Sequence, residues 1–261
     1  MRVLLPPSEA KHPGGAGRPL GRRTRDRDLD RAADPLLQAL VALVPAADAA
    51  ERLLLPDSVA AAALAANGRV WQSPTLPALE RYAGVVYDGL AAADLSAAAR
   101  RLAGRSVLIF SGLFGVLRGN DPVPEYRVPA KATLPGVGVA SSYWRARLPE
   151  LLPPLLDRGP ILDLRSTDYA GMWQPARDAL RPTLISVRIL SATPSGRLAV
   201  VSYNSKLAKG RLAAAVLERA AAGRPVRDAD DVAGVWQELG GSRVGAGTTG
   251  RAGRIAVELI E

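Results

Sequence analysis

Cysteine is absent from the 261-residue sequence, and histidine occurs once, at His12. Without thiols the chain forms no disulfide, performs no thiol-based redox chemistry and ligates no iron–sulfur cluster. A single histidine argues against the common histidine-rich metal sites and against a Ser-His-Asp triad. We therefore expect no metal and no cofactor, and we expect Asp, Glu, Lys or Tyr to move protons unless His12 alone does so.

Long apolar runs are absent as well. No stretch of about eighteen apolar residues could span a bilayer, and the opening MRVLLPP is too short for a secretory signal. Together with the lack of cysteine, these features predict a cytoplasmic protein with no membrane partner. The length suffices for a full core, and no internal repeat or linker divides it, so we expect a single domain over residues 1–261, present as a monomer.

Lysine is scarce beside arginine, at 4 residues against 30, although the formal net charge is +9. Such a charge favours polyanionic partners, namely nucleic acid, nucleotides or other phosphates, whereas a composition bias toward arginine is the alternative explanation. Against that bias, a retained lysine indicates a position that needs a compact ammonium group. The four lysines are Lys11, Lys131, Lys206 and Lys209.

Three short apolar runs, at residues 2–5, 107–110 and 161–164, predict buried strands. Each run precedes a polar segment, at 8–11, 118–127 and 165–169 respectively. Because parallel neighbouring strands deliver their loops to one edge of a sheet, these segments would build one cleft. We expect Lys11, Arg118, Asp168 and Lys206 to meet at its mouth.

The remaining pattern predicts an α/β fold. Helices are expected at residues 35–44, 57–66, 78–90, 95–102 and 228–239, in a stretch at 142–156 interrupted by prolines, and in a long helix ending at 222. A hairpin is expected from 183–190 and 198–203, a final strand at 255–260 and a flexible segment at 240–253. If Lys206 and Lys209 lie in the first turn of the long helix, they oppose its dipole, and an anion between them would resolve the conflict.

Four segments resemble the YaaA family of peroxide-stress proteins. They are LLPPSEAK (4–11), SGLFGVLRGNDPVPEYR (111–127), DLRSTDYAGMW (163–173) and VVSYNSKLAKGRL (200–212), and they occur in the family's order. The resemblance implies a mixed α/β fold, in which helices flank a mixed sheet, with a positively charged cleft. It further implies a cytoplasmic role in the peroxide stress response, through DNA binding or protection and limitation of free iron.

Two hypotheses for the function remain open. In the first, the protein binds nucleic acid: cations neutralise phosphates while aromatic rings stack on bases. In the second, it is an enzyme acting on a small anionic or nucleobase-containing substrate, and a carboxylate whose pKa is raised by burial acts as general base. The candidate bases are Asp168, Glu9 and Asp121. The candidate ligand contacts are Ser8, Lys11, Arg118, Tyr126, Arg127, Tyr143, Trp144, Ser166, Tyr169, Ser202, Lys206, Lys209 and Arg211.

Overall fold

The computed structural model describes residues 1–20, 26–156, 159–175, 183–192, 197–249 and 254–260. The main strands are β1 (Arg2–Leu5), β3 (Val107–Ser111), β4 (Gly115–Arg118), β8 (Ile161–Asp163), β9 (Leu184–Ala192), β10 (Leu198–Ala199), β11 (Ser242–Thr249) and β12 (Arg254–Ile260). Over the described residues they form an eight-stranded mixed sheet in the order β11-β12-β9-β8-β1-β3-β4, with β10 paired to β9. Four shorter strands form two small sheets: β2 (Leu76–Pro77) with β5 (Pro122–Val123), and β6 (Thr133–Leu134) with β7 (Gly138–Val139).

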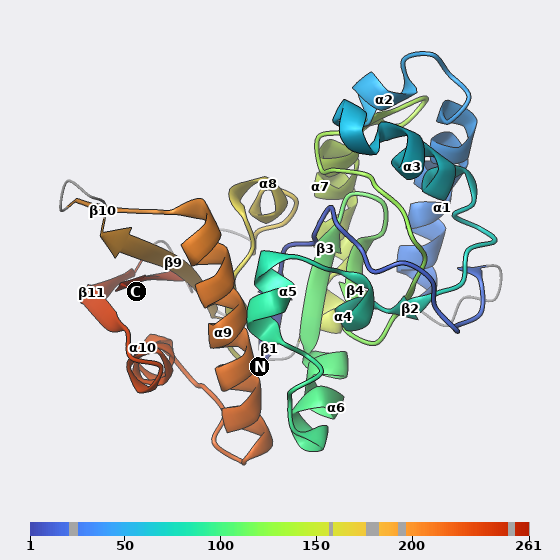
Figure 1. Ribbon diagram of the computed structural model, residues 1–261. Helices are drawn as coiled ribbons and strands as arrows, with labels where there is room; N and C mark the ends of the chain where they lie inside the picture. Colours follow the sequence, from blue (N-terminus) through green and yellow to red (C-terminus); the bar gives the residue numbers. More distant parts are fainter. Residues whose placement is uncertain (21–25, 157–158, 176–182, 193–196, 250–253, 261) are drawn as a thin grey trace.

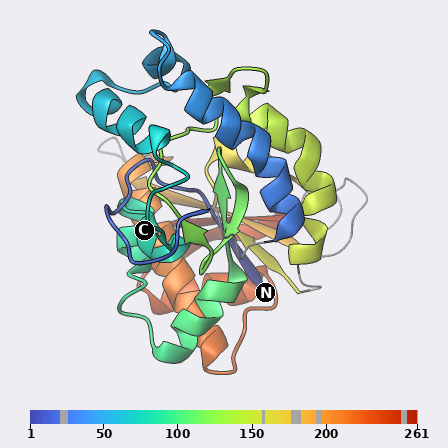
Figure 2. The same cartoon turned by 90° about the vertical axis from the view of Figure 1, so that its right-hand side faces the viewer.

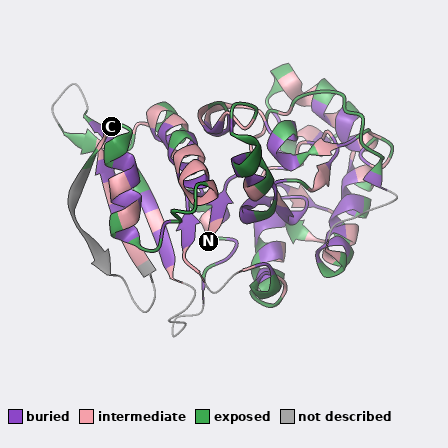
Figure 3. Cartoon of the chain, turned by 90° about the horizontal axis from the view of Figure 1, so that it is seen from below, coloured by how far each residue is buried: buried purple, intermediate pink, exposed green. Residues whose placement is uncertain are grey.

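The three strands predicted from apolar runs are confirmed, and they are parallel neighbours. β1 lies between β8 and β3, with Leu4 opposite Asp163 on one side and Leu108 on the other. All residues of β3 and β8 are buried, as expected for strands covered on both faces. In Figure 3 the buried residues run through the sheet and along the inner faces of the helices.

The helices are α1 (Arg27–Leu43), α2 (Ala49–Arg52), α3 (Asp57–Gly68), α4 (Ala78–Arg81), α5 (Val85–Leu90), α6 (Ala97–Ser106), α7 (Ala140–Leu151), α8 (Thr167–Ala170), α9 (Ser202–Ala221), α10 (Ala229–Glu238) and a short 3₁₀ turn, η2 (Pro153–Leu155). Figures 1 and 2 together show α9 and α10 on one face of the sheet and α1 and α7 on the other. The buried apolar residues form one continuous cluster from Val3 to Leu259, so the chain folds as a single α/β domain.

The helix predicted over residues 78–90 is in fact two helices, α4 and α5. Between them Tyr82 has extended backbone, and Gly84 has φ +113°, a conformation that only glycine adopts readily. The freed segment forms a β-bridge from Tyr82 to Lys11, and the Ala83 N–H donates to the Ala10 carbonyl at 3.1 Å. The break therefore attaches this segment to the loop that follows β1.

Two other expectations change in the structure. Residues 240–253 were expected to be flexible, but β11 occupies Ser242–Thr249 and pairs antiparallel with β12; residues 250–253 lie outside the described part. The predicted hairpin is confirmed as β9 and β10, but its second strand is short because α9 already begins at Ser202. In α7, Pro149 lies inside the helix, which continues to Leu151 before η2.

Candidate functional site

The site lies at the carboxyl ends of β1 and β8, near the middle of the sheet. From β1 the chain passes to β3 on one side, and it later returns to β8 on the other. Loops diverge at such a change of direction and leave a crevice, which is where ligands bind in open parallel sheets. The segments 8–11 and 164–170 both begin at this edge, and the N-terminal end of α9 lies at the same end of the sheet (Figure 1).

Lys11 lies between two tyrosine rings. Its Nζ is 4.2 Å from the ring centroid of Tyr126 and 5.1 Å from that of Tyr82, and it donates to the Ser8 carbonyl at 3.0 Å. Burial lowers the pKa of Lys11 to about 7; the charge of Glu9 acts in the opposite direction, and that of Arg127 adds to the lowering. A substantial fraction of this lysine is therefore a neutral amine at physiological pH.

The two rings are held by a chain of hydroxyl groups. The Tyr126 hydroxyl lies 2.6 Å from the Tyr82 hydroxyl and 2.6 Å from Ser111 Oγ. Ser111 in turn accepts hydrogen bonds from the backbone N–H groups of Leu113 and Phe114, at 3.2 and 3.0 Å. Burial raises the pKa of Tyr126 well above its usual value, so this chain stays protonated at neutral pH. It fixes both aromatic walls around the lysine.

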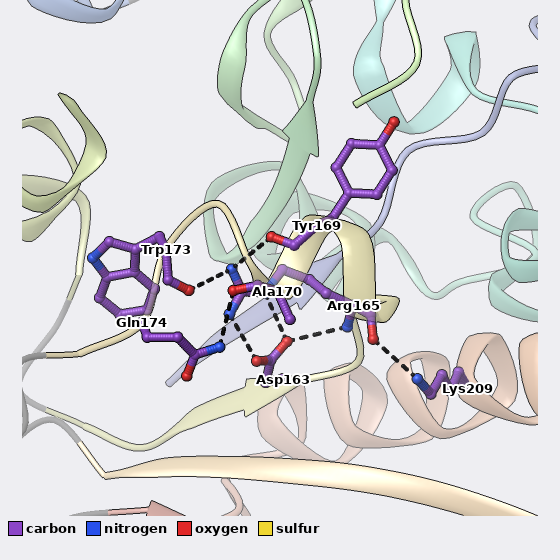
Figure 4. Close-up of polar contacts among 7 residues, drawn as sticks. All are labelled: Asp163, Arg165, Tyr169, Ala170, Trp173, Gln174 and Lys209. Atoms are coloured by element: carbon purple, nitrogen blue, oxygen red, sulfur yellow. Dashed lines mark hydrogen bonds and ion pairs between the residues drawn. The ribbon is translucent and has the colours of Figure 1, made fainter. Parts of the chain in front are cut away.

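Tyr169, in α8, brings a second buried hydroxyl group to this edge. Its side chain is 8% exposed, and its hydroxyl has no hydrogen-bond partner of normal geometry among the described residues. Burial raises its pKa, and the negative charge of Glu9 contributes to the increase. In Figure 4 the ring points away from the ion pair below it. The backbone N–H of Ala130 acts on the hydroxyl oxygen and opposes the increase in pKa, so the proton of the hydroxyl remains available to donate to a ligand.

The rim of the site carries charges of both signs. Arg127 Nε lies 3.7 Å from a Glu9 carboxylate oxygen, and Lys131 Nζ lies 3.0 Å from an Asp168 oxygen. The Lys131 and Asp168 side chains are 65% and 49% exposed, so the second pair is largely solvated. These are the cations best placed to meet an anionic ligand.

Below the site, a buried ion pair anchors the loop after β8 (Figure 4). Arg165 donates to both carboxylate oxygens of Asp163 at 2.8 Å, and also to the backbone carbonyls of Tyr169 and Trp173. The Lys209 ammonium, whose pKa is lowered by burial, donates to the Arg165 carbonyl at 3.1 Å. This cluster ties α8 to α9 and so positions Tyr169.

The sequence-predicted residues of the first and third loops do meet, and the last residues of the second loop, Tyr126 and Arg127, join them. Ser8, Glu9, Lys11, Tyr126, Arg127, Ser166, Asp168 and Tyr169 belong to this edge. Sequence reasoning missed Tyr82, Ser111 and the Asp163–Arg165 pair. The Asp-x-Arg pattern at a strand end was a signal for the pair, whereas nothing local indicated Tyr82, which reaches Lys11 through the helix break.

Arg118 and Asp121 do not join them, which corrects the expected convergence. β4 folds back antiparallel on β3, so Arg118 lies opposite Leu108, near the amino end of β3. There Asp121 Oδ2 accepts a hydrogen bond from the Arg118 N–H at 2.8 Å, and the Asn120 N–H donates to the Gly104 carbonyl. The chain returns to the site only at residues 125–127.

The aromatic pair at the start of α7 packs into the protein. The Trp144 side chain is fully buried, and its Nε1 donates to the Gly112 carbonyl at 2.9 Å, so neither face is open to a base. The Tyr143 hydroxyl donates to the Ala32 carbonyl, and the Arg147 guanidinium covers its ring.

The lysines of α9 lie deeper in the helix than expected. Because α9 begins at Ser202, Lys206 and Lys209 fall beyond its first turn. Lys209 is engaged with the Arg165 carbonyl, while Ser202, Lys206 and Arg211 are exposed. The condition stated for the predicted anion site, that both lysines lie in the first turn of the helix, is therefore not met.

A hollow of about 710 Å³ borders the other side of the tyrosine cluster. His12, Glu80, Tyr82, Asp88 and Arg100 are among its lining residues. Across the described residues, no group of three His, Asp or Glu side chains is arranged to hold a metal ion. Within the same part of the chain, no helix is long and apolar enough to cross a membrane.

Comparisons with known proteins agree with the motifs. The model of the family described as peroxide stress protein YaaA matches residues 1–232. A UPF0246 protein of Streptomyces coelicolor is 40% identical over 219 residues, 83% of each chain. UPF0246 proteins of Corynebacterium efficiens and Corynebacterium glutamicum are 37% and 33% identical over 217 and 246 residues, covering 82% and 92% of this chain and 83% and 93% of their own. The chain belongs to the peroxide stress protein YaaA family.

Proposed function

We propose that this protein acts in the cytoplasm during peroxide stress by binding a phosphate-bearing ligand, either nucleic acid or a nucleotide, at the carboxyl ends of β1 and β8. The family's description supports the link to peroxide stress. The observation that carries the binding proposal is the grouping of Lys11, from the loop after β1, with Arg127 and Lys131, from the loop before α7, beside the acids Glu9 and Asp168 that act on Tyr169.

The chemistry of the rim suits phosphate. Lys131 is exposed enough to exchange its carboxylate partner for a ligand, and the exposed Lys206 lies on the helix that begins at the same edge. The net charge of +9 would draw a polyanion toward the molecule. Glu9 and Asp168, among these cations, would limit how many phosphates of a long strand are held and favour a nucleotide-sized contact.

The second candidate, an enzyme acting on a small anionic or nucleobase-containing substrate, is favoured by one observation. Glu9 lies close enough to affect the pKa values of both Lys11 and Tyr169, so a carboxylate, an amine and a phenol lie near one another. Glu9 is the general base of this alternative, since Asp121 lies near the other end of β3 and Asp168 is paired with Lys131 on the surface.

Fluorescence anisotropy tests the binding proposal. Labelled single-stranded and duplex oligonucleotides are titrated with the protein at salt concentrations from about 50 to 200 mM, with nucleoside monophosphate as competitor. We expect Lys131→Ala and Lys206→Ala to weaken binding and to make the log–log salt slope shallower by roughly 0.7–0.9 for each phosphate that the variant no longer neutralises.

The matched control is Arg101→Ala. Arg101 is an exposed cation of α6, which leads into the amino end of β3 and so lies at the other end of the sheet. The proposal fails if no nucleic acid or nucleotide binds at low salt, or if the Arg101 variant weakens binding as much as the Lys131 variant.

A further inference from the structure

We propose that Lys11 is a nucleophilic amine that forms an imine with an aldehyde borne by a phosphate-containing ligand at the carboxyl ends of β1 and β8. The inference rests on the ligand site proposed above and adds to it a substrate class and a covalent step. The evidence for it is the position and contacts of four side chains, those of Lys11, Tyr169, Glu9 and Arg127.

Lys11 differs from the other three lysines in what surrounds its nitrogen. Lys131 forms an ion pair with Asp168, Lys209 donates to the Arg165 carbonyl, and Lys206 is exposed. The Nζ of Lys11 instead lies against two aromatic faces, and its hydrogen-bond acceptors among the described residues are backbone carbonyls, those of Ser8 and Glu9. Aromatic walls without a carboxylate ion pair disfavour the hydrated ammonium form, and the lowered pKa of about 7 agrees with that geometry.

Tyr169 supplies the second requirement, a donor for the carbonyl oxygen. Its hydroxyl is buried and protonated at neutral pH; the backbone N–H of Ala130 acts on its oxygen, which leaves the hydroxyl's own proton free to donate. A phenol in this state can donate to an aldehyde oxygen and stabilise the negative charge that develops there when an amine attacks. Arg165, held by Asp163, fixes the backbone of Tyr169 and therefore the direction of the ring (Figure 4).

The covalent step balances without a further reagent. The nitrogen lone pair of neutral Lys11 attacks the carbonyl carbon, and the carbon–oxygen π pair moves to oxygen, which yields a carbinolamine. The two protons of the amine are transferred to that oxygen, which leaves as water, and a carbon–nitrogen double bond remains. Glu9, whose charge acts on both Lys11 and Tyr169, is placed to relay these protons.

The cations at the rim of the site favour an aldehyde that carries an anionic group. The charge of Arg127 acts on Lys11, and Lys131 lies four residues further along the same loop. These cations can hold a phosphate group carried by the aldehyde. Two sources share this chemistry: a free sugar phosphate in its open-chain form, and a deoxyribose that has lost its base within a DNA strand.

Reductive trapping tests the proposal. The full chain is incubated with glyceraldehyde 3-phosphate and sodium cyanoborohydride, and adducts are located by intact mass and peptide mapping. We expect one adduct, on Lys11, with a rate that rises with pH around a midpoint of about 7. Glyceraldehyde without phosphate should need about tenfold more compound for the same yield, which corresponds to roughly 1.4 kcal/mol. A second arm uses an oligonucleotide with one base-less deoxyribose, and the arm that labels at lower concentration identifies the source.

Three variants separate the possible outcomes. Lys11→Arg replaces the amine with a guanidinium that forms no such imine, so it should yield no adduct at any aldehyde concentration that labels the wild type. Tyr169→Phe should still fold and label about tenfold or more slowly, in line with the loss of one oxyanion donor. Arg101→Ala, near the other end of β3, should label like the wild type.

Adducts spread over Lys131, Lys206 and the N-terminal amine at the rate of Lys11 would overturn the imine proposal. Absence of adduct in a wild-type chain that binds oligonucleotide would overturn it as well and leave the proposed binding function intact. Equal labelling by both glyceraldehyde compounds, with no oligonucleotide bound, would overturn the phosphate-bearing class and the binding function together.

Discussion

Lys11 makes the stability of the fold depend on pH in a predictable direction. Its pKa is about 7 in the folded protein, whereas an unfolded lysine titrates near roughly 10.4. Below pH 7 both states carry the proton, and the buried charge destabilises the fold. Between these two values the unfolded state binds more protons, so the free energy of unfolding rises with pH. We expect this rise from pH 7 to 9 in urea unfolding to be smaller in Lys11→Met; equal slopes would contradict it.

The Asp163–Arg165 pair predicts a large loss of stability from a single substitution. Arg165 is fully buried as a side chain and Asp163 is 5% exposed, so removing either leaves a buried charge without its partner. We expect Arg165→Ala to lower the free energy of unfolding by about 3–5 kcal/mol. Arg188→Ala is the control, because the Arg188–Glu258 pair is exposed and should cost at most about 1 kcal/mol. Similar losses in the two variants, measured by urea unfolding, would refute the assignment.

At the level of single residues, the scarcity of lysine in an arginine-rich chain directed attention to all four lysines alike. Only the structure shows that the surroundings of Lys11 differ from those of the other three. Arg118 and Asp121 had equally suggestive neighbours in sequence. They lie away from the site because β4 folds back along β3, and the residues of the turn do not by themselves predict this strand pairing.

The contact between α5 and α9 depends on glycine at two facing positions. A Cβ on Gly89 would overlap the Leu207 carbonyl, and one on Gly210 would overlap the Val86 carbonyl. Both obstacles are backbone, which cannot rotate away, so the helices would have to separate. We expect Gly89→Ala to lower the free energy of unfolding by about 1–3 kcal/mol or more.

Gly234 in α10 gives the matched control for that substitution. Nothing lies within 4 Å of a Cβ at this position. Replacing a glycine inside a helix by alanine reduces the entropy lost on folding, so Gly234→Ala should stabilise the protein by roughly 0.5–1 kcal/mol. Thermal melts compare the melting temperatures of both variants with that of the wild type. A higher melting temperature for Gly89→Ala would show that the close approach of α5 and α9 does not require glycine.

Element positions followed largely from periodicity, and the exceptions have local physical causes. The helix at 78–90 is divided because Gly84 permits a backbone angle that lets residues 82–83 pair with the loop after β1. β11 was missed because its glycine-rich sequence has low strand propensity, while the free edge of β12 supplies the pairing that orders it.

At the scale of the whole molecule, the sheet extends beyond the matched family region. That region ends at residue 232, yet β12 pairs with β9 from Arg254 to Ile260 and covers its edge. A chain ending at Leu239 should expose β9 as a long apolar edge and lose the Trp236–Ile260 hydrogen bond. We expect this truncation to melt at a lower temperature and to self-associate in light scattering, whereas we expect the full chain to stay monomeric. A monomeric truncation with an unchanged melting midpoint would contradict this.

The position of β12 has a consequence for the protein as the ribosome makes it. β9 is synthesised before its partner β12. One edge of β9 therefore lacks this partner until some sixty further residues have left the exit tunnel. During that interval the nascent chain exposes an apolar edge strand that can pair with other chains. The helix α9, which is synthesised between the two, packs on a face of the sheet and leaves this edge open until β12 arrives.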